Sequence, residues 1–467
     1  IGSSLAGATT AWILGSSGLQ VALIDPITFP RQKACGEGLS HMGLSFLQSL
    51  ALWSPELEKA ATPFWGYRVY PQAGRAFNLC SLDTPQGVGI SRVLLDGKIN
   101  EKVASLTTVT PIASSVTHAT FNQSPYQHWD ISLSDESTIS AKSLVVASGG
   151  AELMKIFPKT HAPKYKKAKD SRYGMALWAT GEWQTENQSM VHIHHRNEGQ
   201  YLVTPLTSES VNISMLLSGK IHIKKAEALE TACTLATKSG FHIHEISPAL
   251  GAASISHRTL TSTPKELYFI GDAVERFDPI GGMGMTHALY SAGLAANKIL
   301  LSHSANYNFT NHSSTNHYSG LKSNRPLKRH INTSAPDSNS YYKNRARISF
   351  YLRLLSYMSV VLNVKENRAL ISLARHLPKI CLRTTDYIKN CLHWETTKML
   401  ALSIRPEPVG SEPAGSEPAG SEPVRPAPTS RPALGSTLPS HLTHTIENKH
   451  ILASHVFSND FSEDSHA

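Results

Sequence analysis

The most constraining feature of this sequence is the stretch from Phe269 to Ile299, FIGDAVERFDPIGGMGMTHALYSAGLAANKI. A short apolar run ends in Gly271-Asp272, and a loop follows that carries Pro279 and the glycines Gly281, Gly282 and Gly284. The pattern predicts a strand that brings a carboxylate to its tip, then a turn whose glycines let the backbone approach a flat or anionic ligand closely. The helix of small residues that comes next offers unpaired N–H groups and the positive end of its dipole.

A second glycine pattern opens the chain, IGSSLAGATTAWILGSSGLQVALID. Gly2, Ser4 and Gly7 occupy the three positions of G-x-G-x-x-G, with serine in the middle position. A buried-strand run then ends in Asp25, at nearly the spacing expected for the acid that binds the ribose of a dinucleotide. This stretch therefore predicts a Rossmann-like unit.

The first strand of that unit is missing from the sequence. A Rossmann unit opens with a buried strand of about five residues before its first glycine, and only Ile1 stands before Gly2. We expect either a fragment of a longer gene product or a misassigned start, and we favour the fragment.

Together the two stretches resemble the FAD-binding motifs of the p-hydroxybenzoate hydroxylase-like oxidoreductases, nearest their geranylgeranyl-reductase-like and monooxygenase members. The resemblance implies that Asp272 accepts a hydrogen bond from the ribityl chain of FAD. It also implies that the turn from Pro279 to Gly284 lies along the isoalloxazine. Further motifs add to the expected cofactor-binding set, which is Gly2, Ser4, Gly7, Asp25, Arg31, Lys33, Gly36, Arg92, Gly271, Asp272, Pro279, Gly282 and Gly284.

Three of those residues lie in RQKACGEGLS, which resembles a family loop in which C-G-x-G-L follows basic residues. Arg31 and Lys33 would place positive charge near the pyrophosphate, and Gly36 would permit close backbone approach. Cys35 is expected to be a small buried residue beside the cofactor. Arg92 and Asp96 match the family pattern R-x-x-x-D/L, whose arginine touches FAD; a solvated surface charge is the alternative for Arg92. The run LVVASGG resembles the family's V-V-x-A-D-G strand, with serine in place of aspartate.

The predicted fold is α/β, α+β overall: a discontinuous Rossmann-like FAD-binding domain at 1–150 and 260–300, with an inserted substrate domain at 151–259. Period-2 segments between Tyr173 and Gly219 predict an antiparallel sheet. The resemblance implies that this sheet forms the substrate domain, with one face over the flavin. A flexible connector is expected at 301–344 and a helical region at 345–404, which caps the flavin domain or lies on a membrane surface. The proline-rich repeat GSEPAGSEPAGSEP predicts a disordered tail at 405–467.

Composition limits the classes of partner and the kinds of site that the chain is expected to have. The net charge is +9, but no basic run interleaved with aromatic residues indicates nucleic-acid binding. The five cysteines show no metal-site spacing, and no apolar run reaches the roughly 18 residues of a membrane span. We therefore expect a cytoplasmic protein without a metal, with a peripheral membrane contact as an alternative and the oligomeric state open. His192, His194 and His195 are expected to be exposed on a strand and not metal ligands.

The cofactor is easier to predict than the reaction. The first hypothesis is an FAD-dependent monooxygenase that uses NAD(P)H and oxygen on a small organic or apolar substrate. The second is a geranylgeranyl-reductase-like enzyme that reduces C=C bonds of a lipid, and a tryptophan-halogenase-like enzyme ranks last. A truncated or degenerate relative without catalysis is the non-enzyme alternative. No general acid or base is predicted; His287, at the start of the last helix, is a candidate flavin contact, with helix packing as the alternative.

Overall fold

A computed structural model of the chain describes residues 1–80, 84–124, 126–149, 155–158, 164–184, 186–221, 223–262, 266–276 and 282–312. The predicted C-terminal helical region and tail lie outside these residues. Within them, no helix is both long and apolar enough to cross a membrane.

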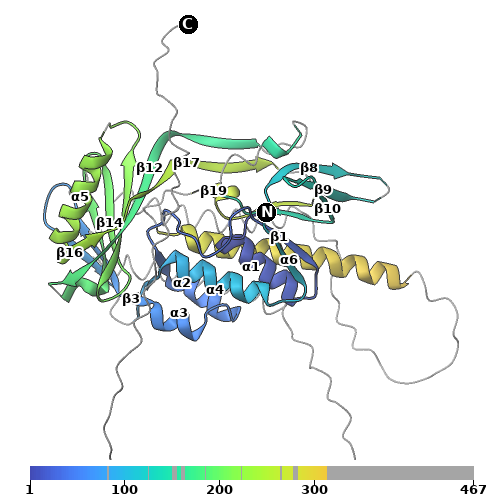
Figure 1. Cartoon of the computed structure of the whole chain (residues 1–467), viewed down its shortest axis with the longest axis horizontal. Coiled ribbons are helices and arrows are strands. Elements are labelled where there is room, and N and C mark those ends of the chain that lie inside the picture. Colours follow the sequence, from blue (N-terminus) through green and yellow to red (C-terminus); the bar gives the residue numbers. More distant parts are fainter. Residues whose placement is uncertain are drawn as a thin grey trace, which may run out of the picture. The chain divides into compact units, whose positions relative to one another are not determined.

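Parallel strand pairs and long helices form the part that surrounds the first glycine turn (Figure 1). Helix α1 (Leu5–Ser16) leads to β1 (Val21–Ile24), which pairs in parallel with β7 (Val109–Ile112). Strand β11 (Leu144–Val146) pairs in parallel with β18 (Leu267–Phe269). Parallel pairs covered by helices are the arrangement expected of a Rossmann-like domain.

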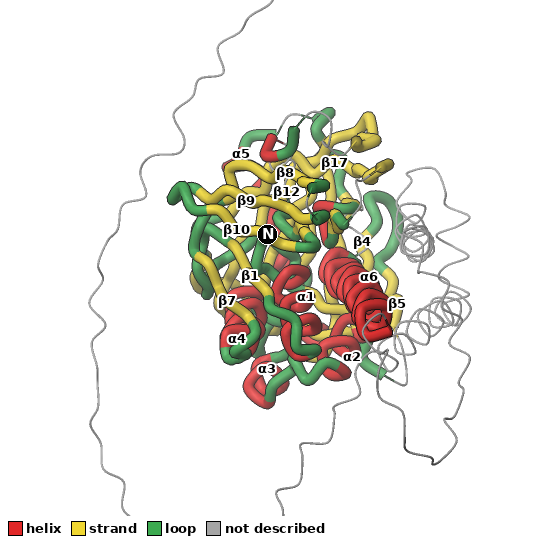
Figure 2. Tube along the Cα trace, turned by 90° about the vertical axis from the view of Figure 1, so that its right-hand side faces the viewer, coloured by secondary structure: helices red, strands yellow, loops and turns green. Residues whose placement is uncertain are grey.

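Four helices enclose the core of this part: α1, α2 (His41–Ser49), α4 (Arg92–Ala104) and α6 (Gly284–His312). Figure 2 shows α6 alongside α1. Gly293 of α6 lets the ring of Phe46 approach so closely that a Cβ there would lie 2.8 Å from it. The ring of Phe46 also stacks on Tyr290 of α6, with centroids 5.0 Å apart. The small residues predicted for this helix thus allow close helix packing.

The first two residues form hydrogen bonds to both parallel pairs, and Ile24 of one pair lies in the same core cluster as Val146 of the other. The Ile1 ammonium donates to Val145 O at 2.7 Å, and Ile1 O accepts from the Ala147 N–H at 2.7 Å. The Gly2 N–H donates to Ile24 O at 2.7 Å, on the other pair. Beside these contacts lies a cavity of about 510 Å³, bordered by β1, β11 and α1. The expected gap in the sheet is therefore a space with strand edges on two sides.

Smaller antiparallel sheets complete this part. One has the order β2 (Gly38–Ser40), β6 (Gly87–Gly89), β3 (Thr62–Phe64), and α3 (Pro55–Ala60) precedes β3. The other has the order β10 (Thr138–Ala141), β9 (His128–Leu133), β8 (Val116–Asn122).

The segment predicted as the substrate domain, 151–259, forms a large sheet together with strands from outside those bounds, β4, β5 and β19. The main path of the sheet runs β19-β17-β12-β15-β14-β13-β4-β5, with β16 paired to β12. Most pairs are antiparallel, as predicted, but β13 and β4 run parallel. Short 3-10 turns occur at Glu186–Ser189 and Gly271–Ala273. The strand bounds are β4 (Gly66–Tyr70), β5 (Phe77–Cys80), β12 (Lys164–Trp183), β13 (Met190–His195), β14 (Gly199–Pro205), β15 (Ser210–Ser218), β16 (Phe241–Ile246), β17 (Leu250–Ser262) and β19 (Glu275–Arg276).

Helix α5 (Lys225–Lys238) covers one face of this sheet (Figure 1). Its buried residues Ala232 and Leu235 belong to the same core cluster as Leu177, Val203 and Ile213 of the central strands. Because side chains alternate along a strand, their neighbours Trp178, Thr204 and Asn212 point to the opposite face. That face also carries Ile193 and Leu202, which belong to a smaller apolar cluster, so it is mixed in character.

The prediction of exposed histidines on β13 is wrong. His192, His194 and His195 are 0%, 2% and 9% exposed. Strand β13 lies between β14 and β4 and is not at an edge, and the Tyr70 ring stacks on His194 with centroids 4.0 Å apart. The His194 ring also shares a 2.8 Å hydrogen bond with Ser239 Oγ, beyond α5.

The last helix also runs further than expected. Helix α6 continues to His312, beyond the boundary placed at residue 300. The sequence LSHSANYNFTNH is rich in residues with modest helix propensity, which is why it was interpreted as the start of a connector.

Candidate functional site

The turn into α1 requires glycine at two of its three motif positions. Gly2 has φ +94°, and a Cβ there would lie 2.8 Å from Ala147 C and O. A Cβ at Gly7 would lie 1.7 Å from Gly2 O, which no rearrangement of a side chain can relieve. The chain thus folds tightly against the end of β11 before α1 begins.

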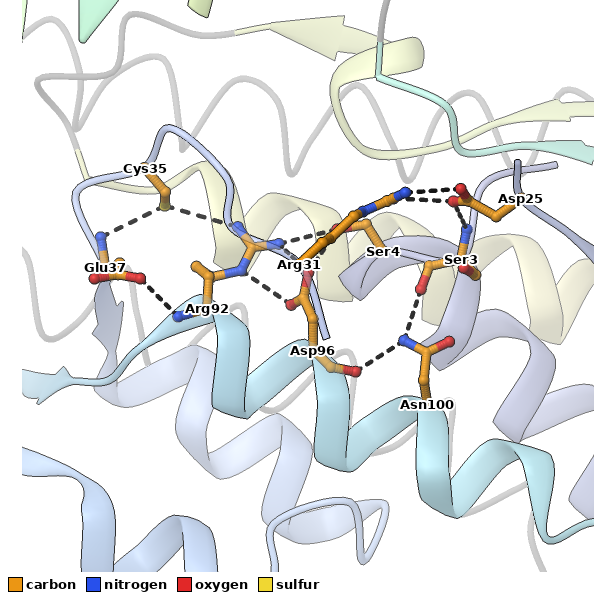
Figure 3. Close-up of polar contacts among 9 residues, drawn as sticks. All are labelled: Ser3, Ser4, Asp25, Arg31, Cys35, Glu37, Arg92, Asp96 and Asn100. Atoms are coloured by element: carbon orange, nitrogen blue, oxygen red, sulfur yellow. Dashed lines mark hydrogen bonds and ion pairs between the residues drawn. The ribbon is translucent and has the colours of Figure 1, made fainter. Parts of the chain in front are cut away.

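Ser4, in the middle position, is tied to α4. Its Oγ donates to Asp96 Oδ2 at 2.8 Å and accepts from Arg92 Nη2 at 3.0 Å (Figure 3). Both bonds draw the hydroxyl toward α4. The serine substitution therefore links the turn to this helix.

Arg92 is not a solvated charge, because it is only 4% exposed. Its Nε and Nη2 donate to the two carboxylate oxygens of Asp96 at 3.0 and 2.7 Å. Burial alone would lower the pKa of Arg92, but the Asp96 carboxylate outweighs burial and raises it. The guanidinium is a fixed positive charge beside the turn.

The carboxylate of Asp25, at the end of β1, forms an ion pair with the guanidinium of Arg31. Arg31 Nη1 and Nη2 donate to its two oxygens at 2.7 and 2.9 Å, and the Ser3 N–H donates to Oδ2 at 2.8 Å (Figure 3). Burial alone would raise the pKa of Asp25, but the bonds from Arg31 and from the Ser3 and Ile27 N–H groups outweigh it and lower the pKa. Asp25, which the motif assigns to the ribose, and Arg31, which is expected near the pyrophosphate, therefore form an ion pair with each other.

Lys33 and Gly36 lie on the loop that follows. The Lys33 side chain is exposed, yet desolvation by surrounding protein, with repulsion from Arg92, lowers the pKa of its ammonium. The carboxylates of Asp272 and Asp96 act in the opposite direction, so Lys33 is within electrostatic reach of both. A Cβ at Gly36 would lie 3.2 Å from Ser214 Oγ of β15, which places the loop against the large sheet.

Cys35, on the same loop, is half-buried and has a free thiol. Its sulfur accepts from Arg92 Nη1 at 3.7 Å and from the Glu37 N–H at 3.5 Å. The expected small residue beside the site is found, although it is only partly buried.

The second motif delivers Asp272 as predicted, on a short turn after β18. Gly271 has φ +57°, and its N–H donates to Ser291 Oγ of α6 at 2.8 Å. Arg276 Nε lies 3.3 Å from Asp272 Oδ2. The side chain of Asp272 is 43% exposed, so its carboxylate is accessible to a ligand.

The glycines before α6 leave room for a ligand. Among the residues that the structure describes, none lies within 4 Å of a Cβ built at Gly282, at φ +63°, or at Gly284. Pro279 and Gly281 lie outside the described residues. His287 is buried near the start of the helix, and its N–H donates to Met283 O at 2.8 Å.

The structure also shows a buried glutamate that sequence reasoning missed. Glu37 accepts hydrogen bonds from the Arg92 N–H, from Trp178 Nε1 and from Asn212 Nδ2. The one signal was its place in CGEG, where a charged residue stands between two glycines. No local pattern points to Trp178 or Asn212, since both lie far away in sequence.

The arrangement fits an anionic dinucleotide. The glycine turn, Arg31, Lys33 and Arg92 supply close backbone approach and positive charge, as a pyrophosphate requires. Asp25 and Asp272 supply acceptors for hydroxyl groups. If FAD binds here, these residues would hold its pyrophosphate and its ribose and ribityl hydroxyls.

Solved structures share this fold at low sequence identity. The flavin-dependent brominase Bmp2 superposes with a TM-score of 0.63 and 15% identity, over 86% of this chain and 97% of the brominase. The p-nitrophenol 4-monooxygenase PnpA from Pseudomonas putida DLL-E4 gives a TM-score of 0.57 and 12% identity, over 85% of this chain and 96% of that one. The Diels-Alderase PyrE3 gives a TM-score of 0.59 and 12% identity, over 84% of this chain and 79% of that one.

Sequence comparison finds a shorter match. Menaquinone reductase from Mycobacterium tuberculosis is 27% identical over 157 residues, or 32% of this chain. The match spans only 36% of that reductase, about a third of its length. No protein-family model matches the sequence. The solved structures confirm the predicted fold class: this chain has the p-hydroxybenzoate hydroxylase-like fold, which it shares with flavin-dependent monooxygenases and halogenases.

Proposed function

We propose that this protein is an FAD-dependent oxidoreductase of the monooxygenase type, which uses NAD(P)H and oxygen on a small organic or apolar substrate. The observation that carries the proposal is the approach of two distant motifs. A Cβ at Gly271, in the second motif, would lie only 3.3 Å from the Cβ of Ala6, in the helix that follows the first glycine turn. Both motifs thereby serve one site whose charge and open glycines suit a flavin dinucleotide.

The roles of the chain's own residues follow from their chemistry. Bound FAD would supply the electron transfer. Arg31, Lys33 and the α1 turn would hold the pyrophosphate, and Asp272 would accept from the ribityl chain. The face of the large sheet opposite α5, which carries Trp178, Thr204 and Asn212, would orient the substrate and exclude water. No described side chain has the contacts of a general acid or base, which suits a reaction whose chemistry belongs to the cofactor.

A reductase acting on a lipid quinone or isoprenoid is the second candidate. Two observations favour it: the match to menaquinone reductase, and the run Cys35-Gly36-Glu37-Gly38-Leu39, which resembles the geranylgeranyl-reductase-like loop. The fold accommodates either chemistry, because fold alone does not determine function.

The first test is the visible absorption spectrum of the purified 467-residue chain after free flavin has been removed. A flavin spectrum with FAD released on denaturation supports the proposal. NAD(P)H oxidation that consumes oxygen then favours the monooxygenase, whereas anaerobic reoxidation of the reduced flavin by menaquinone favours the reductase. A protein that stays colourless with added FAD would contradict both and leave the non-catalytic relative.

A further inference from the structure

Glu37 combines a left-handed backbone with almost complete burial. Its φ is +53°, in the region that favours glycine, and its side chain lies in a residue that is 1% exposed. A residue with a Cβ is strained in this conformation, and burial of a carboxylate costs further free energy unless hydrogen bonds compensate. Strained residues of this kind cluster at functional sites, so the contacts of Glu37 matter.

Three donors from three different elements converge on its carboxylate. Oε1 accepts from the Arg92 N–H at 2.7 Å, at the first residue of α4. Oε2 accepts from Trp178 Nε1 of β12 at 2.6 Å and from Asn212 Nδ2 of β15 at 3.3 Å. Burial raises the pKa of Glu37, while these three bonds and the Arg92 charge oppose that rise. Since all its partners donate, the geometry suits the ionised form.

These contacts join the proposed cofactor site to the large sheet. Trp178 and Asn212 are register partners on neighbouring strands, so they share the face opposite α5. On the other side, the Arg92 N–H belongs to the helix whose guanidinium binds Ser4 of the glycine turn. Glu37 is therefore the point where the loop, α4 and the sheet meet.

We propose that Glu37 is a positioning residue that fixes the sheet face carrying Trp178 and Asn212 relative to the loop carrying Arg31, Lys33 and Gly36. Glu37 thus sets the distance between the substrate and the flavin. This inference rests on the proposed function for the identity of the flavin, but the mechanical link rests on the hydrogen bonds alone.

The variant Glu37→Gln tests the link with almost no change of shape. Glutamine presents one acceptor and one donor, so its NH₂ must face either Arg92 or the sheet. If it faces the sheet, Asn212 can rotate its amide, because its Oδ1 is buried and has no partner among the described residues. Trp178 Nε1 cannot adapt and loses its acceptor. In either orientation one buried N–H is left unpaired.

Five full-length proteins decide the matter: wild type, Glu37→Gln, Trp178→Phe, the double variant, and Glu136→Gln. Glu136 is a matched control, because it also has a left-handed backbone, at φ +67°, but is exposed. Hydrogen exchange in residues 34–40 and 174–180 is measured by mass spectrometry. The midpoint potential of bound FAD is measured on the same five proteins. For Glu37→Gln we expect exchange at least tenfold faster in both segments, and a more positive potential, because a buried negative charge is lost. Glu136→Gln should behave as wild type.

The double variant separates positioning from packing. If the glutamine NH₂ faces the sheet, Trp178→Phe removes the unpaired N–H and should restore the Tm lost in Glu37→Gln, while the potential stays shifted. If it faces Arg92, the unpaired N–H is that of Arg92, and the Tm stays low. A Glu37→Gln protein with wild-type exchange in both segments and a wild-type potential would overturn the proposal, whatever its Tm. If wild type binds no FAD, the proposed function fails, and exchange in the two segments still decides whether Glu37 couples the loop to the sheet.

Discussion

The buried Arg92–Asp96 pair holds the glycine turn to α4, and one substitution tests its contribution. Arg92→Gln would leave Asp96, which is 2% exposed, without its cation. Breaking a buried pair from one side costs about 3–5 kcal/mol. We expect a correspondingly lower free energy of unfolding in urea, together with weaker FAD binding.

The matched control lies on the same helix. Lys98 pairs with Glu101 at 2.8 Å, but on the surface. Exposed pairs contribute little, because solvent screens them. Lys98→Gln should therefore unfold like wild type, and equal losses in the two variants would show that burial of the Arg92 pair has no special role.

Two glycines of the predicted site should respond in opposite ways to alanine. A Cβ at Gly7 meets Gly2 O at 1.7 Å, so Gly7→Ala should lower the Tm even without cofactor. A Cβ at Gly284 meets none of the described residues within 4 Å, so Gly284→Ala should leave the apoprotein Tm unchanged. If the flavin lies over this turn, the added methyl group should weaken FAD binding at least tenfold, as measured by titration. Unchanged affinity would remove Gly284 from the cofactor site.

Among the elements, β13 should give the molecule a marked acid sensitivity. Burial lowers the pKa of His194 to about 3 and that of His195 to about 4. An unfolded histidine titrates near 6.5, so the unfolded state binds more protons below that pH. The stabilisation is complete above pH 6.5 and falls as the pH decreases toward 4 and 3, by up to about 1.4 kcal/mol per pH unit for each histidine.

Unfolding in urea between pH 7 and pH 4 measures this slope. His194→Gln retains a partner for Ser239 but does not titrate, so its stability should depend less steeply on pH. The exposed His242 of β16 provides the control, and His242→Gln should keep the wild-type slope. An equally steep slope in His194→Gln would show that other groups cause the acid sensitivity.

The elements also show what a single sequence can predict. Alternation correctly identified β13 as a strand, but it tells only which residues share a face. Whether both faces are covered depends on Tyr70 from β4 and on Ser239 beyond α5, which no local pattern links to β13. The glycine motifs succeeded partly for the opposite reason. The contact of Gly7 with Gly2 O lies within the motif, whereas the need for glycine at position 2 also depends on Ala147, far away in sequence.

The same limit explains the outcome for the polar residues of the site. Arg92 could not be assigned from its helix alone, because its burial depends on Ser4 and Cys35 from elsewhere in the chain. Glu37 had no pattern at all, since its partners lie on β12 and β15. Residues that join two parts of a fold are the ones that sequence periodicity does not reveal.

At the scale of the molecule, the sheet around the first glycine turn is divided by the cavity between β1 and β11. Ile1 forms hydrogen bonds to β11, and its ammonium is buried, which lowers the pKa of that group to about 6. The Asp25 charge opposes this shift only in part. An ordinary terminal amine titrates near 8, so a chain that starts at Ile1 loses stability as the pH decreases from 8 to 6.

Residues added before Ile1 should change both the terminal charge and the filling of the cavity. Five residues, Val-Val-Ile-Val-Val, placed directly before Ile1 would move the ammonium away and present a strand to both open edges. Strands buried on both faces favour such continuous β-branched runs. We expect a gain on the order of 2 kcal/mol, and so a Tm increase of about 4–8 °C. The difference in stability between the extended and the original chain should increase as the pH decreases from 8 to 6.

The extension Gly-Ser-Gly-Ser-Gly separates the two contributions. It also moves the ammonium, but it has no side chains that fill an apolar cavity, and glycine weakens a strand. We expect it to differ from the original chain in the same pH-dependent way as the valine-rich extension, because the ammonium is moved in both. It should show little of the increase in Tm that comes from filling the cavity. If both extensions raise the Tm equally, the buried charge alone limits stability and the cavity does not accept a strand. If neither does, the two strand pairs are already held together by the contacts of Ile1 and Gly2.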